Sequence, residues 1–485
     1  MDKGKIYGIE IDETLVRGGE RRIMDAAQMQ NDFVVGSCFA KNGGRNDFDH
    51  AYPFGALRLC NVRLVNGEKH VVFEGDAGFD RTGKNGNVMV QIPKFYSRRE
   101  KQGSIERWMV SGICHPGFAL EPCFLRGGKE LEHIYVGAYN SCQKGDGIYS
   151  TTGCTPDVMK SIEEFEQDYA ADGYDAYDFA VMLCLQKLCV IELGTRQLKQ
   201  TLGGVCMMKY SHTPGTPITA LGKNRVSMEF HDRLRNQHFA PGHDIAFGSA
   251  SKSYEHKRLV TEVRRNPDND QWLDVFYEGE DLSAVLEVGK HSAYGAPQEN
   301  GKTDNLPYHT GRCDMQAPFA QELAHLLSPF RYRNIENVWG NVWEFVSGLR
   351  LRELLFRYTF DPEQYQGSSE NWQCHPIPAP EQHLLPDHDP DGPHWISGFS
   401  LDEEQPLAVL PAALASGGVG DWYDAVLNAY KDKDYASAPV DPEKEYCTAT
   451  GGAWDHKFAS PFLYRCFMTR TSKNWLYSNR LCLRK

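Results

Sequence analysis

Long apolar runs are missing from this sequence. The longest uninterrupted one extends only from Phe179 to Leu185, whereas a transmembrane helix needs about 20 consecutive apolar residues. Residues 1–11 also lack an apolar signal core and a lipidation cysteine. We therefore expect a globular protein that is synthesised in the cytoplasm and is not inserted into a membrane.

Clusters of basic residues are scarce as well. The net charge is −13, and the two most basic stretches, 98–101 and 331–333, are short and interrupted. Because a nucleic-acid surface needs clustered Lys and Arg to bind phosphates, this charge balance excludes nucleic acid as a partner.

The sequence has no Cys-x-x-Cys pair, although it has 14 cysteines. Cys184 and Cys189 fall in an apolar stretch of helical character, where a thiol is usually buried and inert. We predict structural thiols for the cysteines, in preference to disulfides or zinc ligands.

Complete enzyme signatures are absent too. The stretch 295–303 resembles a phosphate-binding loop but has five residues between its glycines where four are required. The stretch 321–325 resembles a zinc-protease helix, but Gln321 stands where the first histidine is needed, and there is no Gly-x-Ser-x-Gly nucleophile elbow. We predict a protein that is not an enzyme and has no cofactor.

One acidic stretch leaves two interpretations open. Asp387, Asp389 and Asp391 precede Gly392 as in the first half of a calcium loop, but Gly398 stands where that loop has its bidentate Glu. Residues 387–392 form either a calcium loop or a solvated acidic loop. The neighbouring histidines fit no zinc spacing.

The length of 485 residues exceeds one ordinary domain, so we expect several structural units. We expect an N-terminal β segment over 1–90, used for attachment or oligomer contacts, and a region with two helices over 91–204. An inserted β module over 205–290 and a Pro-, Gly- and Trp-rich remainder over 291–485 follow.

Local signals place several elements within these units. Asn66-Gly67 predicts a hairpin turn between two strands, and residues 266–270 predict a second one inside the β module. Thr155 is a plausible N-cap for the first helix, and Asp175 or Asp178 begins the second, which is apolar on most sides and hence central.

Three C-terminal motifs carry a resemblance. Gly340-Asn-Val-Trp-Glu-Phe345, Gly451-Gly-Ala-Trp454 and Arg480-Leu-Cys-Leu483 occur in the order and separation found in the C-type lectin fold of the formylglycine-generating-enzyme type. The wider chain resembles a family of bacteriophage tail receptor-binding proteins, which includes the variable proteins of diversity-generating retroelements. The stretches that carry this wider resemblance are 87–96, 134–139, 178–193, 305–312 and 332–348.

The resemblance implies an α+β fold, with a C-type lectin-like domain, the N-terminal β segment and the inserted small β module. It also implies a display segment over 455–477 whose exposed side chains bind the ligand, as Tyr, Trp and adaptable polar residues do in paratopes. In the alternative, Phe458, Met468 and Trp475 belong to the core. The predicted ligand-binding residues are Asp455, His456, Lys457, Phe458, Tyr464, Arg465, Cys466, Met468, Thr469, Lys473, Trp475 and Tyr477.

In the family, display positions are hypermutated at the adenines of Asn codons. Such codons cannot yield Lys, Met or Trp, so Lys457, Met468, Lys473 and Trp475 either belong to the fixed frame or arose from other codons.

The resemblance further implies a phage tail protein of the virion that binds a bacterial surface receptor, and we weigh it against two alternative functions. Its partners would be a bacterial surface protein or glycan, other tail proteins and two further copies in a homotrimer. A formylglycine-generating oxidase is one alternative, but it needs two neighbouring cysteines for copper, and Cys466 and Cys482 stand apart. A bacterial surface adhesin is the other.

Overall fold

The protein is mostly β, with 41% of residues in strands and 12% in helices, arranged in many antiparallel sheets and a small barrel. The predicted α+β class is therefore wrong. The error arose in the Pro-, Gly- and Trp-rich remainder over 291–485, which holds a nine-stranded sheet. The computed structural model describes residues 1–15, 18–31, 45–205, 215–230, 239–249, 255–313, 315–321, 324–378, 394–402, 404–414, 426–428, 430–433, 436–439, 441, 443–453 and 459–485.

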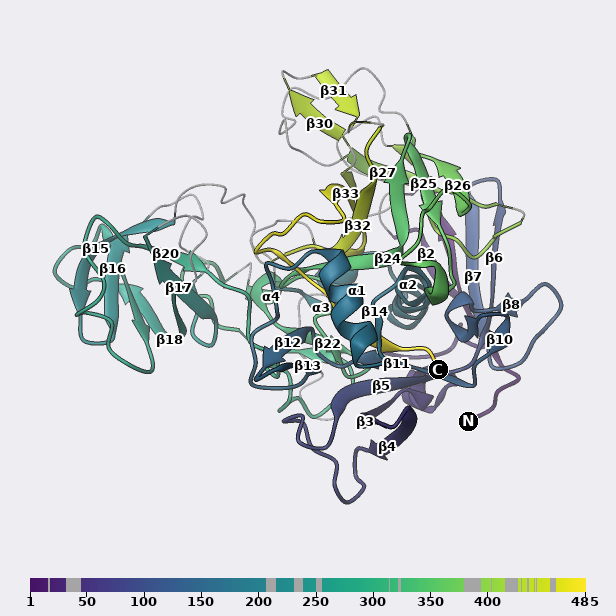
Figure 1. Ribbon diagram of the computed structural model, residues 1–485, viewed down its shortest axis with the longest axis horizontal. Helices are drawn as coiled ribbons and strands as arrows, with labels where there is room; N and C mark the ends of the chain where they lie inside the picture. Colours follow the sequence, from purple (N-terminus) through teal and green to yellow (C-terminus); the bar gives the residue numbers. More distant parts are fainter. Residues whose placement is uncertain are drawn as a thin grey trace.

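The helix α2 (Phe179–Leu193) lies at the centre of the main body (Figure 1). All of its residues are buried, which agrees with the apolar character expected on most of its sides. The Asp178 side chain caps it by accepting a hydrogen bond from the Val181 N–H, and Gly194 ends it in the left-handed conformation. In the described part of the chain no helix has the length and apolarity to cross a membrane.

Two sheets built largely from the N-terminal half pack around this helix. Strands of residues 1–90 pair with later strands in both, so that segment shares its sheets with the rest of the chain. The five-stranded sheet has the order β2 (Glu20–Met24), β1 (Ile6–Asp12), β7 (Ile105–Ser111), β6 (Tyr96–Gln102), β8 (Ala119–Leu120). The six-stranded sheet has the order β14 (Asp175–Ala176), β35 (Leu481–Leu483), β11 (His133–Gly137), β5 (Asn87–Pro93), β3 (Arg58–Val65), β4 (Glu68–Phe73).

The nine-stranded sheet belongs to the C-terminal half. Its order is β26 (Gln373–Pro376), β25 (Leu355–Tyr358), β24 (Trp343–Arg352), β32 (Tyr446–Gly451), β33 (Ser460–Thr469), β29 (Val426–Asn428), β27 (His394–Phe399), β28 (Pro411–Leu414), and β34 (Tyr477–Ser478) pairs with β24. The small sheets are β9 (Leu125–Arg126) with β10 (Lys129–Glu130), β12 (Ser141–Lys144) with β13 (Gly147–Ser150), β30 (Tyr430–Lys433) with β31 (Ala436–Pro439), and β21 (Gly311–Arg312) with β22 (Phe330–Tyr332) and β23 (Ile335–Glu336).

Of the local predictions, the first hairpin turn is confirmed and the start of the first helix is wrong. The Asn66-Gly67 hairpin is confirmed, because β3 and β4 pair directly across that turn, with Val65 opposite Glu68. The first helix, α1 (Ile162–Ala171), starts later than expected: its N-cap is Ser161, which forms a capping box with Glu164. The remaining helices are short: α3 (Leu198–Leu202), α4 (Ala324–Leu327) and the 3₁₀ turns Asp47–His50, Phe54–Ala56, Pro122–Phe124 and Pro362–Gln364.

A closed barrel protrudes from the main body (left in Figure 1). Its strands run from residue 216 to residue 295, and the predicted β module covered 205–290. The predicted hairpin around residues 266–270 is confirmed as the β18–β19 pair. The barrel order is β15 (Thr216–Gly222), β16 (Arg225–Glu229), β19 (Trp272–Tyr277), β18 (His256–Arg265), β17 (Asp244–Gly248), β20 (Ser292–Gly295).

Polar contacts connect the barrel to the main body. His243, just before β17, is buried, and its Nε2 lies 2.6 Å from the Leu327 carbonyl oxygen of α4. Asp244 forms ion pairs with Lys257 at 3.3 Å and Lys302 at 3.4 Å. Burial lowers the pKa of His243 from 6.5 to about 4, against the opposing effects of the Leu327 carbonyl and Asp244. The ring is therefore neutral in the folded protein at pH 7.

This buried histidine makes stability depend on pH. Between pH 6.5 and about 4 the unfolded chain binds a proton at His243 and the folded chain does not, so acidification favours unfolding. We expect His243 to cost about 2 kcal/mol of stability between pH 7.5 and pH 5. Urea unfolding at the two pH values measures this, and His243→Gln should show a smaller loss than the wild type. An identical pH dependence in both proteins would contradict the assignment.

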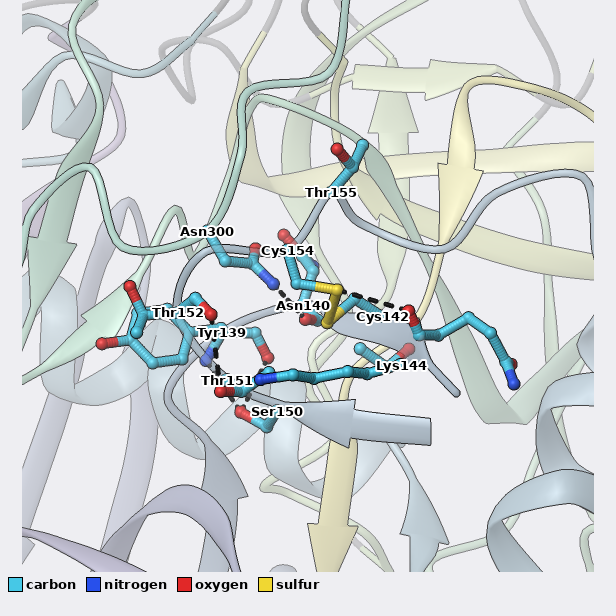
Figure 2. Close-up of a disulfide and its surroundings, with 12 residues drawn as sticks. Tyr139, Asn140, Cys142, Lys144, Ser150, Thr151, Thr152, Cys154, Thr155 and Asn300 are labelled. Atoms are coloured by element: carbon cyan, nitrogen blue, oxygen red, sulfur yellow. Dashed lines mark hydrogen bonds between the residues drawn. A yellow bond between two sulfur atoms is a disulfide. The ribbon is translucent and has the colours of Figure 1, made fainter. Parts of the chain in front are cut away.

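A disulfide joins Cys142 of β12 to Cys154, 12 residues later, beyond β13 (Figure 2). The prediction of structural thiols is wrong for this pair, because the β12–β13 hairpin reverses the chain and brings two distant cysteines together. It is confirmed for Cys184 and Cys189, which are free and buried. Two backbone hydrogen bonds connect the residues around Cys154 to the segment that follows the barrel. They run from Gly153 N to Asn300 O and from Asn300 N to Cys154 O, both at 3.0 Å.

Reduction of this disulfide should lower the free energy of unfolding by about 3 kcal/mol, the cost of freeing a loop of this size in the unfolded chain. Thermal unfolding with and without dithiothreitol measures the effect. The Cys142→Ser/Cys154→Ser variant is the control, since its melting temperature should not respond to the reductant. Alkylation of both residues in the unreduced protein, detected by mass spectrometry, would contradict the bond.

Candidate functional site

A buried ion pair joins two of the motifs that carry the resemblance. Glu344 of β24 and Arg480 lie 2.9 Å apart, and both are buried. Arg480 also donates hydrogen bonds to the backbone carbonyls of Gly137 and Glu336, both at 2.9 Å, and Asn140 donates to Glu344. Burial raises the pKa of Glu344, while Arg480 opposes that rise. The pair fixes the position of β24 relative to β35.

Aromatic side chains pack beside this pair. Tyr477 stacks on Phe345, with ring centroids 5.0 Å apart, and on Trp343 at 6.3 Å. The Arg465 guanidinium lies 5.0 Å from the centroid of the Trp343 ring. Trp339 and Trp343 are buried, as expected of core residues, whereas Trp454 lies outside the described residues.

Much of the predicted display segment is core. Tyr464, Arg465, Cys466 and Tyr477 are buried, so their assignment as exposed ligand-binding side chains is wrong. Consecutive residues of β33 from Ser460 to Cys466 are all buried, so other side chains cover both faces of the strand. Tyr477 belongs to β34 and is covered by the rings on which it stacks. The Tyr464 hydroxyl donates to the Val409 carbonyl at 2.7 Å, and burial raises the pKa of Cys466 to about 12, which leaves an inert thiol.

Other predictions fall on residues that the structure does not describe. Asp455, His456, Lys457 and Phe458 lie outside the described residues, and so does the acidic stretch 387–392. Among the residues that are described, no cluster of His, Cys, Asp and Glu could hold a metal ion.

The rest of the display segment forms a surface loop, residues 469–475, between β33 and β34. Met468, Thr469 and Trp475 are partly buried, and Met468 and Trp475 pack against a core cluster, as in the alternative interpretation. Lys473 is the most exposed, with 49% of its side chain accessible.

Ion pairs hold the 469–475 loop against the first turns of α1. Arg470 pairs with Glu163 at 3.0 Å and with Glu166 at 2.8 Å, and Lys473 pairs with Glu164 at 2.5 Å. The pair at the exposed Lys473 contributes little, because water screens it. The more buried pair of Arg470 with Glu166 restrains the backbone of the loop more strongly.

A separate pocket of about 290 Å³ opens at the far edge of the nine-stranded sheet, around the end of β25. We call it the β25 pocket. Tyr358, Phe360 and Trp372 supply aromatic walls, and the β9–β10 turn at Gly127 and Gly128 supplies a backbone wall. This site could not be predicted from the sequence, because its walls come from segments more than 200 residues apart and no motif marks them.

The polar lining of the β25 pocket is mostly uncharged. The amides of Gln364, Asn371, Gln373 and Gln405 line it, together with the single carboxylate Asp361, and no Lys, Arg or His is among the lining residues. Such a lining suits a neutral ligand rich in hydrogen-bonding groups.

Comparisons with known proteins give no relative: no protein-family model matches the chain, and no curated protein matches it.

Substitution of Arg480 tests whether the buried ion pair between Glu344 and Arg480 stabilises the fold. Arg480→Met should lower the free energy of unfolding by about 3 to 5 kcal/mol, because Glu344 would remain as a buried unpaired carboxylate. Lys473→Met is the matched control, which removes an exposed ion pair and should cost less than about 1 kcal/mol. Urea unfolding measures both. Equal, small effects would show that the buried pair does not hold the two strands together.

Proposed function

We propose that this protein is a phage tail protein that binds a bacterial surface receptor through its C-terminal third. The resemblance of the stretches 87–96, 134–139, 178–193, 305–312 and 332–348 to tail receptor-binding proteins supports this proposal, together with the C-type lectin-like order of the three C-terminal motifs. The contact surface differs from the one that the sequence suggested, because Tyr464, Arg465, Cys466 and Tyr477 are unavailable to a ligand.

The observation that carries the proposal is the restrained 469–475 loop. Ion pairs to α1 and the parallel pairing of β34 with β24 fix both the loop and its exit. On this backbone lie the half-exposed Lys473 and the partly buried Trp475. A fixed backbone lowers the entropy cost of binding, and a Trp supplies a large contact area for few rotatable bonds.

In this proposal the 469–475 loop contacts the receptor with side chains that do not vary in sequence. Lys473 and Trp475 are residue types that adenine mutation of Asn codons cannot produce, so hypervariation is not needed for the binding proposed here. Asp455, His456, Lys457 and Phe458 stay sequence predictions for additional contacts. A homotrimer would present several copies of the loop, and avidity would then strengthen a modest affinity per site.

Binding of the labelled full-length protein to a panel of bacterial strains tests the proposal. We expect some strains to bind, and Lys473→Ala/Trp475→Ala to reduce binding to them at least tenfold, since truncation of an interface Trp costs about 2 kcal/mol or more. Flow cytometry measures binding, and circular dichroism checks that the variant is folded.

The barrel offers a matched control. Val285→Ala/Lys290→Ala removes one exposed apolar residue and one exposed Lys far from the loop in sequence, and it should bind like the wild type. Equal binding by the two double variants would exclude the 469–475 loop as the contact. Failure of the wild-type protein to bind any strain of the panel would contradict the proposed function.

A further inference from the structure

The β25 pocket contains a tyrosine hydroxyl that the fold does not use. Tyr358 is only 2% exposed, and its ring packs against Phe179 at 5.6 Å and Phe360 at 5.5 Å between centroids. Its hydroxyl has no hydrogen-bond partner among the residues that the structure describes and is not one of their fully buried unpaired atoms, so a ligand in the pocket can reach it. Burial, together with Asp402, Cys374 and Glu404, raises the pKa of Tyr358, so the hydroxyl keeps its proton and can donate it.

Trp372 adds a second aromatic group to the wall. One face of its ring lies against the Arg350 guanidinium, 4.4 Å from the centroid. This contact and the burial of the residue hold the indole in place. Within the described chain no acceptor receives a hydrogen bond from its indole N–H. The pocket therefore has two rigid aromatic donors.

Side-chain amides provide the complementary groups. Asn371 and Gln373 are exposed and hydrogen-bond through their side chains to none of the described residues. The side-chain carbonyl oxygen of Gln364 accepts a hydrogen bond from Thr359 Oγ1 at 3.1 Å. The NH₂ group of Gln364 remains available to donate to a ligand. Each amide can both donate and accept, as a pair of adjacent hydroxyl groups requires.

The one charge in the lining is already engaged. Asp361 Oδ1 accepts hydrogen bonds from the backbone N–H groups of Glu363 at 3.2 Å and Gly127 at 3.5 Å. Since no cation lines the pocket and one carboxylate does, an anionic ligand would be repelled. The pocket therefore favours a neutral ligand.

We propose that the β25 pocket binds a neutral sugar unit. The volume of about 290 Å³ lies at the lower end of the range for small-ligand sites, which suits one sugar ring. The aromatic side chains offer apolar surface to the C–H face of the ring, and the hydroxyl, indole and amides bond its hydroxyl groups. This inference rests on the proposed function, because it makes a neutral surface glycan part of the receptor.

Saturation-transfer NMR with the full-length protein tests the pocket directly. The probes are glucose, galactose and N-acetylglucosamine, with N-acetylneuraminic acid as the anionic probe. We expect at least one neutral sugar to bind, and Tyr358→Phe and Gln373→Ala each to weaken its binding at least fivefold. Gln366→Ala is the control, because it removes a nearby exposed amide that does not line the pocket.

Three results would overturn the inference: no binding of any neutral sugar, stronger binding of the anionic sugar, or binding unchanged by both pocket variants. Cell binding separates this inference from the proposed function. If the protein binds cells but none of the sugars, and Tyr358→Phe binds cells like the wild type, the pocket inference fails and receptor binding stands. If the pocket variants weaken sugar binding but no strain binds the protein, the pocket is supported and the proposed function fails.

Discussion

The burial of α2 along its whole length is the constraint on which the rest of the structure depends. An unpaired charge is costly in such a place, so each charged group of the helix requires a partner. Lys187 pairs with Glu121 at 2.7 Å, Glu192 with Arg333 at 2.6 Å, and the N-cap Asp178 with Arg484 at 2.7 Å. The same helix thereby ties together segments from the N-terminal half, the middle and the end of the chain.

Both candidate surfaces are connected to this framework. Arg484 donates hydrogen bonds to the Phe360 carbonyl at 2.9 Å and to the Tyr365 hydroxyl at 3.1 Å, which connects the β25 pocket to the cap of α2. On the other side, Glu166 of α1 accepts from Ser347 of β24 at 2.6 Å and pairs with Arg470 beside the 469–475 loop. Two separate surfaces are thus restrained by the same core.

Local features could be predicted from the sequence, and non-local ones could not. The turn at Asn66-Gly67 and the cap at Asp178 depend on a few adjacent residues, and both occur where expected. The capping box of Ser161 and Glu164 was visible in the sequence, but the predicted start of α1 was Thr155, because a proline follows it and proline is common at the first position of a helix. The Cys142–Cys154 bond required knowledge of which strands form a hairpin.

The candidate site shows the same limit more clearly. The side chains from Tyr464 to Cys466 mix aromatic, basic and thiol groups, as an exposed paratope does, yet they are buried. Phe356 and Phe399 pack on the Tyr464 ring, and Arg465 lies over the Trp343 ring. Such packing joins segments that are distant in the chain and leaves no local pattern. The β25 pocket was unpredictable for the same reason, since its walls meet only in the folded protein.

The position of β35 has a consequence for biosynthesis. This strand lies between β14 and β11 in the six-stranded sheet, and the flanking Arg480 and Arg484 neutralise Glu344 and Asp178. A nascent chain from which residues 480–484 have not yet emerged would have to bury two carboxylates without their cations. The main body can therefore close only after residues 480–484 have left the ribosome, whereas the barrel contains all of its own strands and can form earlier.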